Sequence, residues 1–509
     1  MKTPYILTLD AGTTGVKCAA FTREGTALSS HVAAYPTRYP APGWAQQEPE
    51  EVLAASLRAI GCVLAAVPAA DCAALVFSGT MNGCIAIDRA GQALYPNMIH
   101  SDLRAAPQVE EIKRRIPLVD YYRATGNRID VHSGLPKYMW LRENAPEVYR
   151  QAWKFVNIKD YLYGRVTGRP GGTDRSDASL CNCLDMATGD WAWEVLQACG
   201  VAADKLPQLR VSADVTGALC GEFARLTGLR PGLPVAVGAG DGACAAHGAR
   251  SHTPGDAYMN IGSSAWVSAM SEAPVLDGEM RIFNYFDADE TRYNVCGTVQ
   301  SGAAASNWAI ENLIYPGTRA EDCDFAALEA LAASVPAGAG GVVYLPTLAG
   351  ERTPWWTARA SGTLMGFTLY HDRRHVARAV YEGVMQSLHL CGDILGENGL
   401  PVRKLTLIGG GAKSALWGQM AADMFGCPVG IHQTPHEATS LGAAFIAGVG
   451  IGWYRDYADA ARYIRTRRTY QPDPATHQAY RRHLAVFRTL YPRMREAYEA
   501  LYDYQQQAD

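Results

Sequence analysis

The sequence lacks a membrane-spanning apolar run and any strong excess of charge. No window of roughly 18 uncharged apolar residues occurs, which is about the length that a membrane-spanning helix needs. The net charge is -4 over 509 residues, so the charge balance gives no reason to expect binding to nucleic acid or to a membrane surface. With 48% hydrophobic residues, a chain of this length predicts a globular protein with two large domains.

Paired cysteine motifs are also lacking. The thirteen cysteines are scattered, Cys181 and Cys183 are the only close pair, and no C-x-x-C occurs. This pattern argues against a structural zinc site and favours reduced thiols packed as small apolar groups. The first residues lead directly into an expected strand, without the basic and then apolar segments of a secretory leader. We therefore expect a cytoplasmic protein.

The common nucleotide-binding motifs are lacking or incomplete. The segment Gly409-Gly410-Gly411-Ala412-Lys413-Ser414 has alanine where the motif G-x-x-x-x-G-K-[ST] needs glycine. Gly238-x-Gly240-x-x-Ala243 matches the dinucleotide fingerprint in its weaker form. Asp241, however, would place a negative charge inside the pyrophosphate cradle, and Asp256 comes before the next strand rather than after it. A Rossmann domain is therefore disfavoured.

Strand-like runs alternate with helical patterns along the chain. The expected strands are Ile6–Leu9, Ala19–Phe21, Ala74–Phe77, Cys84–Asp88, Leu233–Gly238 and Leu405–Ile408. The expected helices are Glu50–Ala66, Pro136–Asn144, Arg373–Leu395 and Ala415–Phe425, with a solvated amphipathic helix over Tyr480–Gln507. This alternation predicts an α/β fold with mostly parallel central sheets.

An approximate internal repeat suggests how the domains are related. The segment TLDAGTTGVKCAAF, residues 8–21, resembles MNIGSSAWVSAM, residues 259–270, and both read as strand, turn and strand. Two copies of one hairpin predict two similar domains that face each other. The polar stretch GARSHTPGDA supplies a boundary, so we predict an N-terminal domain of residues 1–247 and a C-terminal domain of residues 248–509.

Both hairpin turns combine glycine with hydroxyl side chains, which suits phosphate oxygens. The turn residues are Thr13 and Thr14 in the first hairpin, and Gly262, Ser263 and Ser264 in the second. Backbone amides and hydroxyls together form a concave set of donors, and glycine allows close approach of a ligand. Asp10 would repel a phosphate unless a divalent cation lay between them, so it is a predicted Mg²⁺-holding residue. The alternative is an Asx turn in which Asp10 bonds only its own loop.

Asp241 and a glycine-rich loop are two further candidates for functional residues. A carboxylate at a strand end and a helix start, held ionised by the helix dipole and amide donors, could accept a proton from a substrate hydroxyl. Its alternative is a simple helix cap. The loop Gly410-Gly411-Ala412 lies between an expected strand and helix, where it could bind a nucleoside or be an ordinary β–α turn.

Together these pieces resemble the FGGY family of carbohydrate kinases, over essentially the whole chain. The most specific match is GTLMGFTLYHDRRHVARAVYEGV, residues 362–384, although Phe367 stands where an aliphatic residue is usual. The segment SGLPKYMWLREN, residues 133–144, follows the other family signature more loosely. The resemblance implies two similar actin-like or ribonuclease H-like ATPase domains around a central cleft, with ATP and Mg²⁺ as cofactors.

The resemblance also implies roles for individual residues. Asp10 matches the acid associated with Mg²⁺, and Asp241 matches the catalytic base. The nucleotide-binding positions it implies are Thr13, Thr14, Lys17, Gly262, Ser263, Ser264, Gly302, Gly410, Gly411 and Ala412.

Within the family, three segments are similar to those of xylulokinases. They are PGWAQQEPEE, FSGTMNGCIAID and NMIHSDLRA. The implied substrate-binding residues are Thr80, Met81, Asn82, His100, Asp102, His132 and Asp241. Asn82 replaces a typical histidine, His100 a tryptophan and Thr80 a glutamine. These changes indicate an altered choice of sugar, or else neutral drift with D-xylulose retained.

The expected activity is ATP-dependent phosphorylation of a small sugar, a ketopentose such as D-xylulose. Another pentulose, a polyol or gluconate stays open, as does a homodimer. Partners would be the sugar and ATP, without nucleic acid or membrane. Two alternatives of other classes are a nucleotide-driven chaperone or filament protein of the actin and Hsp70 type, and a catalytically silent sugar sensor.

Overall fold

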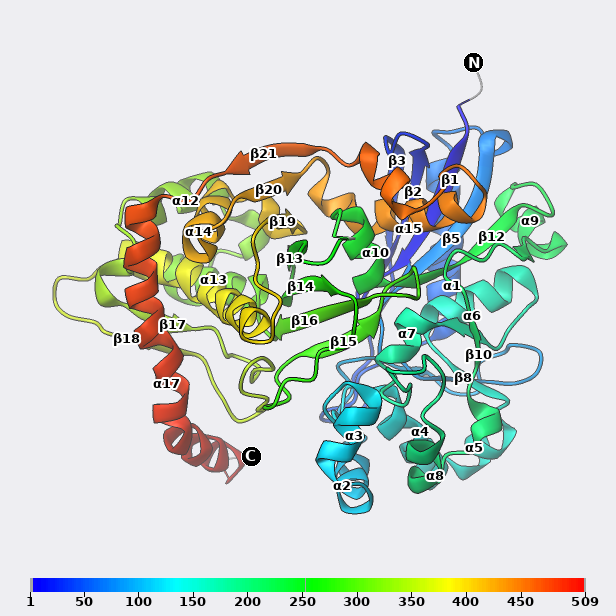
Figure 1. Ribbon diagram of the computed structural model, residues 1–509, viewed down its shortest axis with the longest axis horizontal. Coiled ribbons are helices and arrows are strands. Elements are labelled where there is room, and N and C mark those ends of the chain that lie inside the picture. Colours follow the sequence, from blue (N-terminus) through cyan, green and yellow to red (C-terminus); the bar gives the residue numbers. More distant parts are fainter. Residues whose placement is uncertain (1–2, 252, 508–509) are drawn as a thin grey trace. The chain divides into compact units, whose positions relative to one another are not determined.

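The computed structural model describes residues 3–251 and 253–507, and the chain divides into two compact units (Figure 1). Unit 1 takes in residues 3–251, 271–294 and 437–464. Unit 2 takes in residues 253–270, 295–436 and 465–507. Each unit contains a mixed β-sheet with packed helices, which confirms the predicted α/β class.

The main sheet of unit 1 has six strands in the order β11-β12-β5-β1-β2-β3. Their bounds are β11 Gly217–Ala218, β12 Pro234–Gly240, β5 Cys72–Gly79, β1 Tyr5–Ala11, β2 Gly15–Thr22 and β3 Ala27–Ala34. Strands β12, β5 and β1 are parallel neighbours, whereas β1, β2 and β3 form an antiparallel meander and β11 pairs antiparallel with β12. The carboxyl ends of three parallel strands therefore meet at one edge of the sheet. The expectation of mostly parallel sheets was wrong, because short turns join consecutive strands into antiparallel hairpins.

Alternating apolar residues fix one face of this sheet. Tyr5, Leu7 and Leu9 of β1 share a buried cluster with residues of three helices, α1 (Pro49–Leu64), α6 (Ile158–Thr167) and α9 (Gly221–Thr227). Burial of this face stabilises unit 1, because apolar area removed from water is worth roughly 25 cal/mol per Å².

Two helices that are distant in the sequence pack together on unit 1, namely α10 (Asp241–Gly248) and α15 (Ala438–Gly450). Helix α15 also packs against β1, β2, β5 and β12, and Figure 1 shows it in orange beside the green α10. A Cβ on Gly442 would lie 1.8 Å from the Cys244 carbonyl oxygen, and one on Gly248 1.8 Å from the Ala438 carbonyl oxygen. Glycine at both positions is therefore required for the two backbones to approach so closely.

A second buried cluster of unit 1 forms under the segments between β5 and β12. The remaining helices of this unit are α2 Ala106–Arg115, α3 Leu118–Thr125, α4 Gly134–Asn144, α5 Pro146–Gln151, α7 Arg175–Ser179, α8 Trp193–Cys199 and α16 Tyr457–Ala460. Its short strands are β4 Gln46–Gln47, β6 Ile85–Ile87, β7 Asn97–Met98, β8 Lys154–Val156, β9 Gly172–Asp174, β10 Gln208–Arg210 and β15 Phe283–Phe286.

Unit 2 contains the strand order β16-β14-β13-β19-β20-β21. The bounds are β16 Tyr293–Val299, β14 Ala265–Ser271, β13 Ala257–Ile261, β19 Leu405–Ile408, β20 Val429–His432 and β21 Thr466–Tyr470, with a separate pair β17 Val343–Leu345 and β18 Thr363–Met365. The α-helices are α11 Ala303–Ala309, α12 Phe325–Ala333, α13 Arg373–Glu397, α14 Ala415–Phe425 and α17 Pro474–Gln507. In the part of the chain that the structure describes, none of the helices is long and apolar enough to cross a membrane.

The internal repeat is confirmed as a pair of equivalent antiparallel hairpins. Strands β1 and β2 pair with Ala11 opposite Val16, and β13 and β14 pair with Ile261 opposite Ala265. Each hairpin sits in the sheet of its own unit and has a parallel neighbour beside its first strand, β5 in one case and β19 in the other. The two units therefore repeat the same local architecture.

Candidate functional site

Three strand ends bring the predicted acids of unit 1 to one edge of the sheet. Asp10 in β1 lies opposite Ser78 in β5, and Ser78 lies opposite Ala239 in β12. Asp241 follows two residues after Ala239, as the first residue of α10. Ligands of open α/β sheets bind at such carboxyl ends. The sheet register therefore places Asp10 and Asp241 as a pair at the same edge of the sheet, with strand β5 between β1, which carries Asp10, and β12, which leads to Asp241.

A bulge in β12 sets the course of the chain just before Asp241. The register with β5 shifts between Ala236 and Ala239, and Gly238 has φ 78°. A Cβ on Gly238 would lie 1.7 Å from the Phe77 carbonyl oxygen, so only glycine fits. The Gly240 amide then donates to Ser176 Oγ at 2.9 Å, which fixes the Ala239–Gly240 peptide just before Asp241.

Burial and Asp10 together raise the pKa of Asp241 to about 7, while the Gly242 amide lowers it in part. From the sequence we expected the helix start to keep this carboxylate ionised. That expectation was wrong in direction, since the pKa is raised rather than lowered. The reason is that loss of hydration and a neighbouring like charge outweigh the helix dipole and the amide donor. A carboxylate with a pKa near neutrality is well matched to proton transfer.

Asp10 has a mixed environment. Its Oδ1 accepts a hydrogen bond from Ser78 Oγ at 3.0 Å, and Lys17 lies opposite it on β2. Burial raises the pKa of Asp10, Lys17 and Ser78 lower it, and Glu437 raises it further. The charge of Asp10 also raises the pKa of Asp241, and a divalent cation between two neighbouring carboxylates would relieve such repulsion.

The first hairpin turn exposes both of its threonines. Thr13 and Thr14 are solvent-exposed, and their carbonyl oxygens accept hydrogen bonds from Gln47 Nε2 at 2.8 Å and from the Tyr35 amide at 3.3 Å. Lys17 forms an ion pair with Glu437 at 3.7 Å. The turn is thus held from behind through its carbonyls, and its hydroxyls stay available to a ligand.

The segment after β5 carries three of the predicted sugar-binding residues. The Thr80 amide donates to the Ala11 carbonyl at 3.0 Å, and Met81 packs over Gly240, where an added Cβ would meet its side chain at 2.7 Å. Asn82 has φ 67°, a conformation that asparagine tolerates well. Its Oδ1 is buried and has no hydrogen-bond partner among the described residues. Such an orphaned acceptor is suited to a ligand hydroxyl.

The other predicted sugar-binding residues differ in their accessibility. His100 and His132 are half-buried, and His132 Nδ1 lies 2.7 Å from Asp130 Oδ1. The Asp102 side chain is fully buried in an ion pair with Arg104 at 2.7 Å, and its Oδ2 also accepts from the Ala45 amide at 2.7 Å. Asp102 therefore ties the loop before α2 to residue 45.

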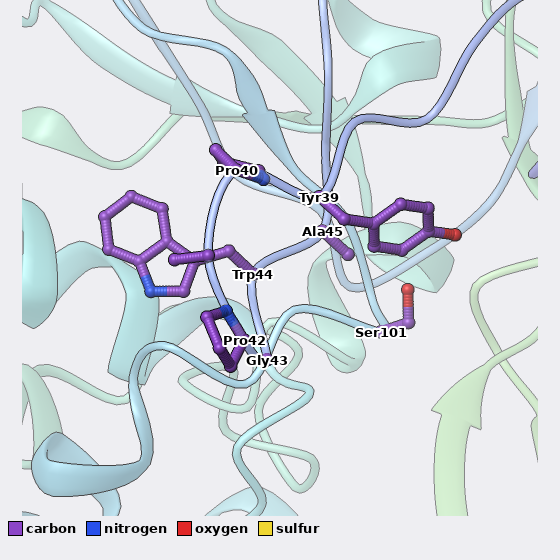
Figure 2. Close-up of a pocket in the computed structure, with 8 residues that line it drawn as sticks. Tyr39, Pro40, Pro42, Gly43, Trp44, Ala45 and Ser101 are labelled. Atoms are coloured by element: carbon purple, nitrogen blue, oxygen red, sulfur yellow. The ribbon is translucent and has the colours of Figure 1, made fainter.

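A pocket of about 540 Å³ lies beside this loop. It is lined by Tyr39, Pro40, Ala41, Pro42, Gly43, Trp44, Ala45 and Ser101 (Figure 2). Figure 2 shows the Trp44 indole and the Tyr39 ring projecting to opposite sides of the 39–45 segment. The Arg104 guanidinium lies 3.8 Å from the Trp44 ring centroid. The pocket wall is thus continuous with the residues that follow His100.

In unit 2 the predicted phosphate turn is exposed and is contacted by the Gly302 loop. Ser263 and Ser264 are exposed at the tip between β13 and β14. The Gly302 amide donates to the Ser263 carbonyl at 2.8 Å, and the Ala303 amide donates to the Gly262 carbonyl at 2.8 Å. A Cβ on Gly302 would lie 2.7 Å from the Ala265 Cβ, so glycine permits this contact.

The glycine-rich loop after β19 reaches the end of the same hairpin. Gly410–Lys413 forms a short 3-10 turn, and Ser414 caps α14 by accepting from the Trp417 amide at 3.0 Å. A Cβ on Gly411 would lie 2.5 Å from the Ile261 Cβ. The structure therefore gathers all seven predicted nucleotide-binding residues of unit 2 around the end of β13. They are Gly262, Ser263, Ser264, Gly302, Gly410, Gly411 and Ala412.

Sequence reasoning missed a buried charge cluster next to Asp241. Lys159 Nζ lies 2.5 Å from Asp160 Oδ1, 3.0 Å from Asp174 Oδ1 and 3.8 Å from Asp177 Oδ2. The ligand atoms of these three acids lie within 4.8 Å of one another, but the Lys159 ammonium already supplies a cation. Asp174 accepts from Ser176, whose Oγ holds the Gly240 amide. The cluster therefore supports the backbone just before Asp241. The sequence gives no sign of it, because its acids and its lysine follow no recognisable spacing.

Glu351 was also missed as a positioning group in unit 2. Its Oε1 accepts from the Gln300 amide at 2.6 Å and from the Arg352 amide at 2.9 Å. Burial raises the pKa of Glu351 to about 7, against the lowering effect of these amides and of Arg352. The carboxyl group anchors the segment that leads to Gly302. Glu351 is the only acid in the stretch LAGERTPWW, residues 348–356, so no spacing of charged residues marked it in the sequence.

The paired strand-end acids and the repeated glycine–hydroxyl hairpins define a phosphotransferase with the sugar-kinase and actin-like ATPase fold. The chain belongs to the FGGY family of carbohydrate kinases, whose N-terminal domain matches residues 5–248 and whose C-terminal domain matches residues 257–451. It therefore phosphorylates a sugar with ATP.

Individual relatives are similar over nearly the whole chain. Xylulose kinase of Escherichia coli (strain K12) is 31% identical over 96% of this chain and 98% of its own length. The crystal structure of gluconate kinase from Lactobacillus acidophilus has a TM-score of 0.91 at 26% identity, covering 98% of this chain and 100% of that one. The ligand-bound xylulose kinase from the same organism has a TM-score of 0.90 at 26% identity, with the same coverage. Fold similarity alone thus does not separate the two sugars.

Proposed function

We propose that this carbohydrate kinase phosphorylates a ketopentose such as D-xylulose, with Asp241 as the general base. The Asp241 carboxylate would take the proton of a sugar hydroxyl while that oxygen bonds the γ-phosphorus of ATP and ADP leaves. The observation that carries the proposal is the position of Asp241 at a strand end beside Asp10, where its pKa is raised to about 7. Positioning and one base are most of what phosphoryl transfer asks of a protein.

We further propose that Asp10 holds Mg²⁺, which when bound neutralises phosphate charge. The exposed hydroxyls of Thr13 and Thr14 would contact the phosphates, together with Lys17. For unit 2 taken by itself, we propose that the turn Gly262–Ser264, Gly302 and the loop Gly410–Ala412 bind nucleotide. The exposed serine and threonine hydroxyls support this assignment.

The choice of a ketopentose over gluconate rests on the charges of the sugar region. A gluconate carboxylate needs a cation, yet the Arg104 side chain is paired with Asp102 and Lys137 Nζ donates to three carbonyls. The buried free Oδ1 of Asn82 suits a neutral hydroxyl donor. We propose that Thr80, Met81, Asn82, His100 and His132 border the sugar, and that Asp102 shapes its loop. The 31% identity to a xylulose kinase supports the same choice.

A screen of ADP release tests this proposal. We expect faster turnover with D-xylulose than with D-gluconate, polyols or hexuloses. Asp241→Asn should lower turnover by at least roughly 10²-fold, the low end for loss of a general base, while the dissociation constant for an ATP analogue stays within about twofold. Near-normal turnover in this variant would remove Asp241 from the role, and a preference for gluconate would overturn the ketopentose.

We also propose that the protein works in the cytoplasm. Across the described residues, the thirteen cysteines are thiols rather than disulfides, and ten of them are buried. Free buried thiols are typical of reducing compartments.

A further inference from the structure

Lys137 is a charged side chain in an unusual place. It lies in α4, within the run Gly134–Leu141 whose residues are all buried, and its own exposure is 0%. Lysine is almost never fully buried unless its charge is compensated. Burial lowers the pKa of Lys137 to about 8, while Asp102, Asp130 and nearby thiols raise it in part. Burying this ammonium therefore costs free energy of folding, which implies that Lys137 has a role that offsets this cost.

Three backbone carbonyls receive the three hydrogens of this ammonium. Lys137 Nζ donates to the Asn82 carbonyl at 2.5 Å, to the Ile99 carbonyl at 2.9 Å and to the His132 carbonyl at 2.8 Å. An ammonium has three donors and no acceptor, so this set satisfies it completely. Hydrogen bonds from a charged donor are stronger than those from a neutral donor, so the three contacts hold these carbonyls firmly.

The three carbonyls belong to the three loops that carry the proposed sugar contacts. Asn82 and His132 are themselves such contacts, and Ile99 immediately precedes His100. The loops come from separate parts of unit 1: after β5, after β7 and before α4. Asn82 also has its left-handed backbone at this point. One side chain thus connects all three loops.

We propose that Lys137 is a positioning residue that sets the distances between the three sugar-binding loops. Among the described residues its ammonium donates to these three main-chain oxygens, so it acts on the sugar through Asn82, His100 and His132 rather than by contact. The inference rests on the proposed function in one respect, namely that these loops bind the sugar. A purely structural role would instead affect stability without affecting sugar recognition.

The test compares Lys137→Met with Lys154→Met. Lys154 is a matched control, because its Nζ donates to the Asp204 and Leu206 carbonyls at 2.8 and 2.7 Å and contacts none of the three loops. For the sugar that gives the fastest ADP release, we expect Lys137→Met to raise the KM at least tenfold, with the KM for ATP within about twofold. Lys154→Met should leave both KM values unchanged. An unchanged sugar KM in Lys137→Met would overturn the proposal.

A second variant covers the case in which Lys137→Met does not fold. Lys137→Arg keeps the charge, but a planar fork cannot direct one donor to each of three carbonyls. We expect hydrogen exchange to accelerate together in peptides that cover residues 80–84, 98–102 and 130–134, and not in those covering 204–206. Acceleration in a single loop, or an unchanged sugar KM, would contradict the proposal.

These outcomes are distinct from failure of the proposed function. If wild-type protein releases ADP fastest with gluconate, the ketopentose is wrong, and the Lys137 test proceeds with gluconate. If Asp241→Asn stays active, the base is wrong, and the KM comparison at Lys137 still decides the positioning role.

Discussion

Asp241 shows how one side chain is tuned by its neighbours. Burial and the charge of Asp10 raise its pKa, and one amide opposes them. A carboxylate with a pKa near 7 is largely ionised at slightly alkaline pH and remains a stronger base than an exposed aspartate. The position of Asp241 between a bulged strand and a helix start makes this balance possible.

The first prediction concerns the pH dependence of catalysis. Because Asp241, the proposed general base, must be ionised to act, kcat/KM for the sugar should fall below about pH 7, by about tenfold per pH unit. Removal of the neighbouring charge in Asp10→Asn should lower the pKa of Asp241, so the acid limb of the residual activity should move to lower pH. A pH–rate profile of both proteins measures this, and an acid limb at the same pH in both would show that Asp10 does not influence the base.

The second prediction concerns Asn82. Histidine at this position would change both shape and hydrogen-bonding capacity, and we expect Asn82→His to shift relative activity toward D-xylulose by roughly 3- to 10-fold against other pentuloses, as one altered hydrogen bond allows. Relative kcat/KM values across a sugar panel measure the shift. An identical sugar profile would mean that residue 82 does not contact the substrate.

At the residue scale, the sequence predicted the acids and hydroxyls better than their supports. Asp10 and Asp241 come together because strand ends of parallel neighbours share an edge, which alternating patterns can anticipate. Ser78, Ser176 and Glu351 act through hydrogen bonds to residues that are distant in the sequence. Such contacts depend on tertiary packing, so no local spacing could indicate them.

At the scale of elements, the contact between α10 and α15 leaves no room for a side chain larger than glycine at Gly248 or Gly442. The third prediction is that Gly442→Ala lowers the free energy of unfolding by about 3 kcal/mol or more, the upper range for overpacking. The reason is that its Cβ would lie 1.8 Å from the Cys244 carbonyl oxygen, and both backbones must move apart. Urea titration measures the change, and turnover should fall too because α10 begins with Asp241.

Gly61 is the matched control for this substitution. It lies inside α1, is exposed and would have nothing within 4 Å of an added Cβ. Gly61→Ala should therefore raise stability by about 0.5–1 kcal/mol, the helix propensity difference. Equal effects at the two glycines would mean that helix propensity, and not the close contact, governs residue 442.

The sequence predicted the bounds of several regular strands and helices closely, but it did not predict the irregular segments. The expected strand over Leu405–Ile408 and the expected helix over Ala415–Phe425 are confirmed with identical bounds. The C-terminal helix begins earlier, at Pro474, and its Phe487 and Tyr491 are buried in a cluster with Leu345. Periodicity predicts such elements because one face is buried. The bulge at Gly238 has no periodic signal, since it depends on the carbonyl of the adjacent strand.

At the scale of the whole molecule, each unit is assembled from stretches that are far apart in the chain. Unit 1 includes residues 437–464 as well as its N-terminal part, and helix α15 from that stretch packs on β1, β2, β5 and β12. Local patterns identified α/β architecture and the repeated hairpin, because both are encoded within short segments. The packing of α15 against the sheet of unit 1 is a contact between distant parts of the chain. A single sequence does not reveal such a contact. The predicted boundary between residues 247 and 248 stays a prediction.

The late position of α15 has a consequence for biosynthesis. A ribosome that adds about 5–20 residues per second needs roughly 10–40 s to extend the chain from α10 to the end of α15. During that interval the nascent first sheet lacks the helix that covers part of its apolar surface. The newborn polypeptide is therefore expected to depend on chaperone shielding, and to complete the packing of unit 1 only after residues 437–464 have been made.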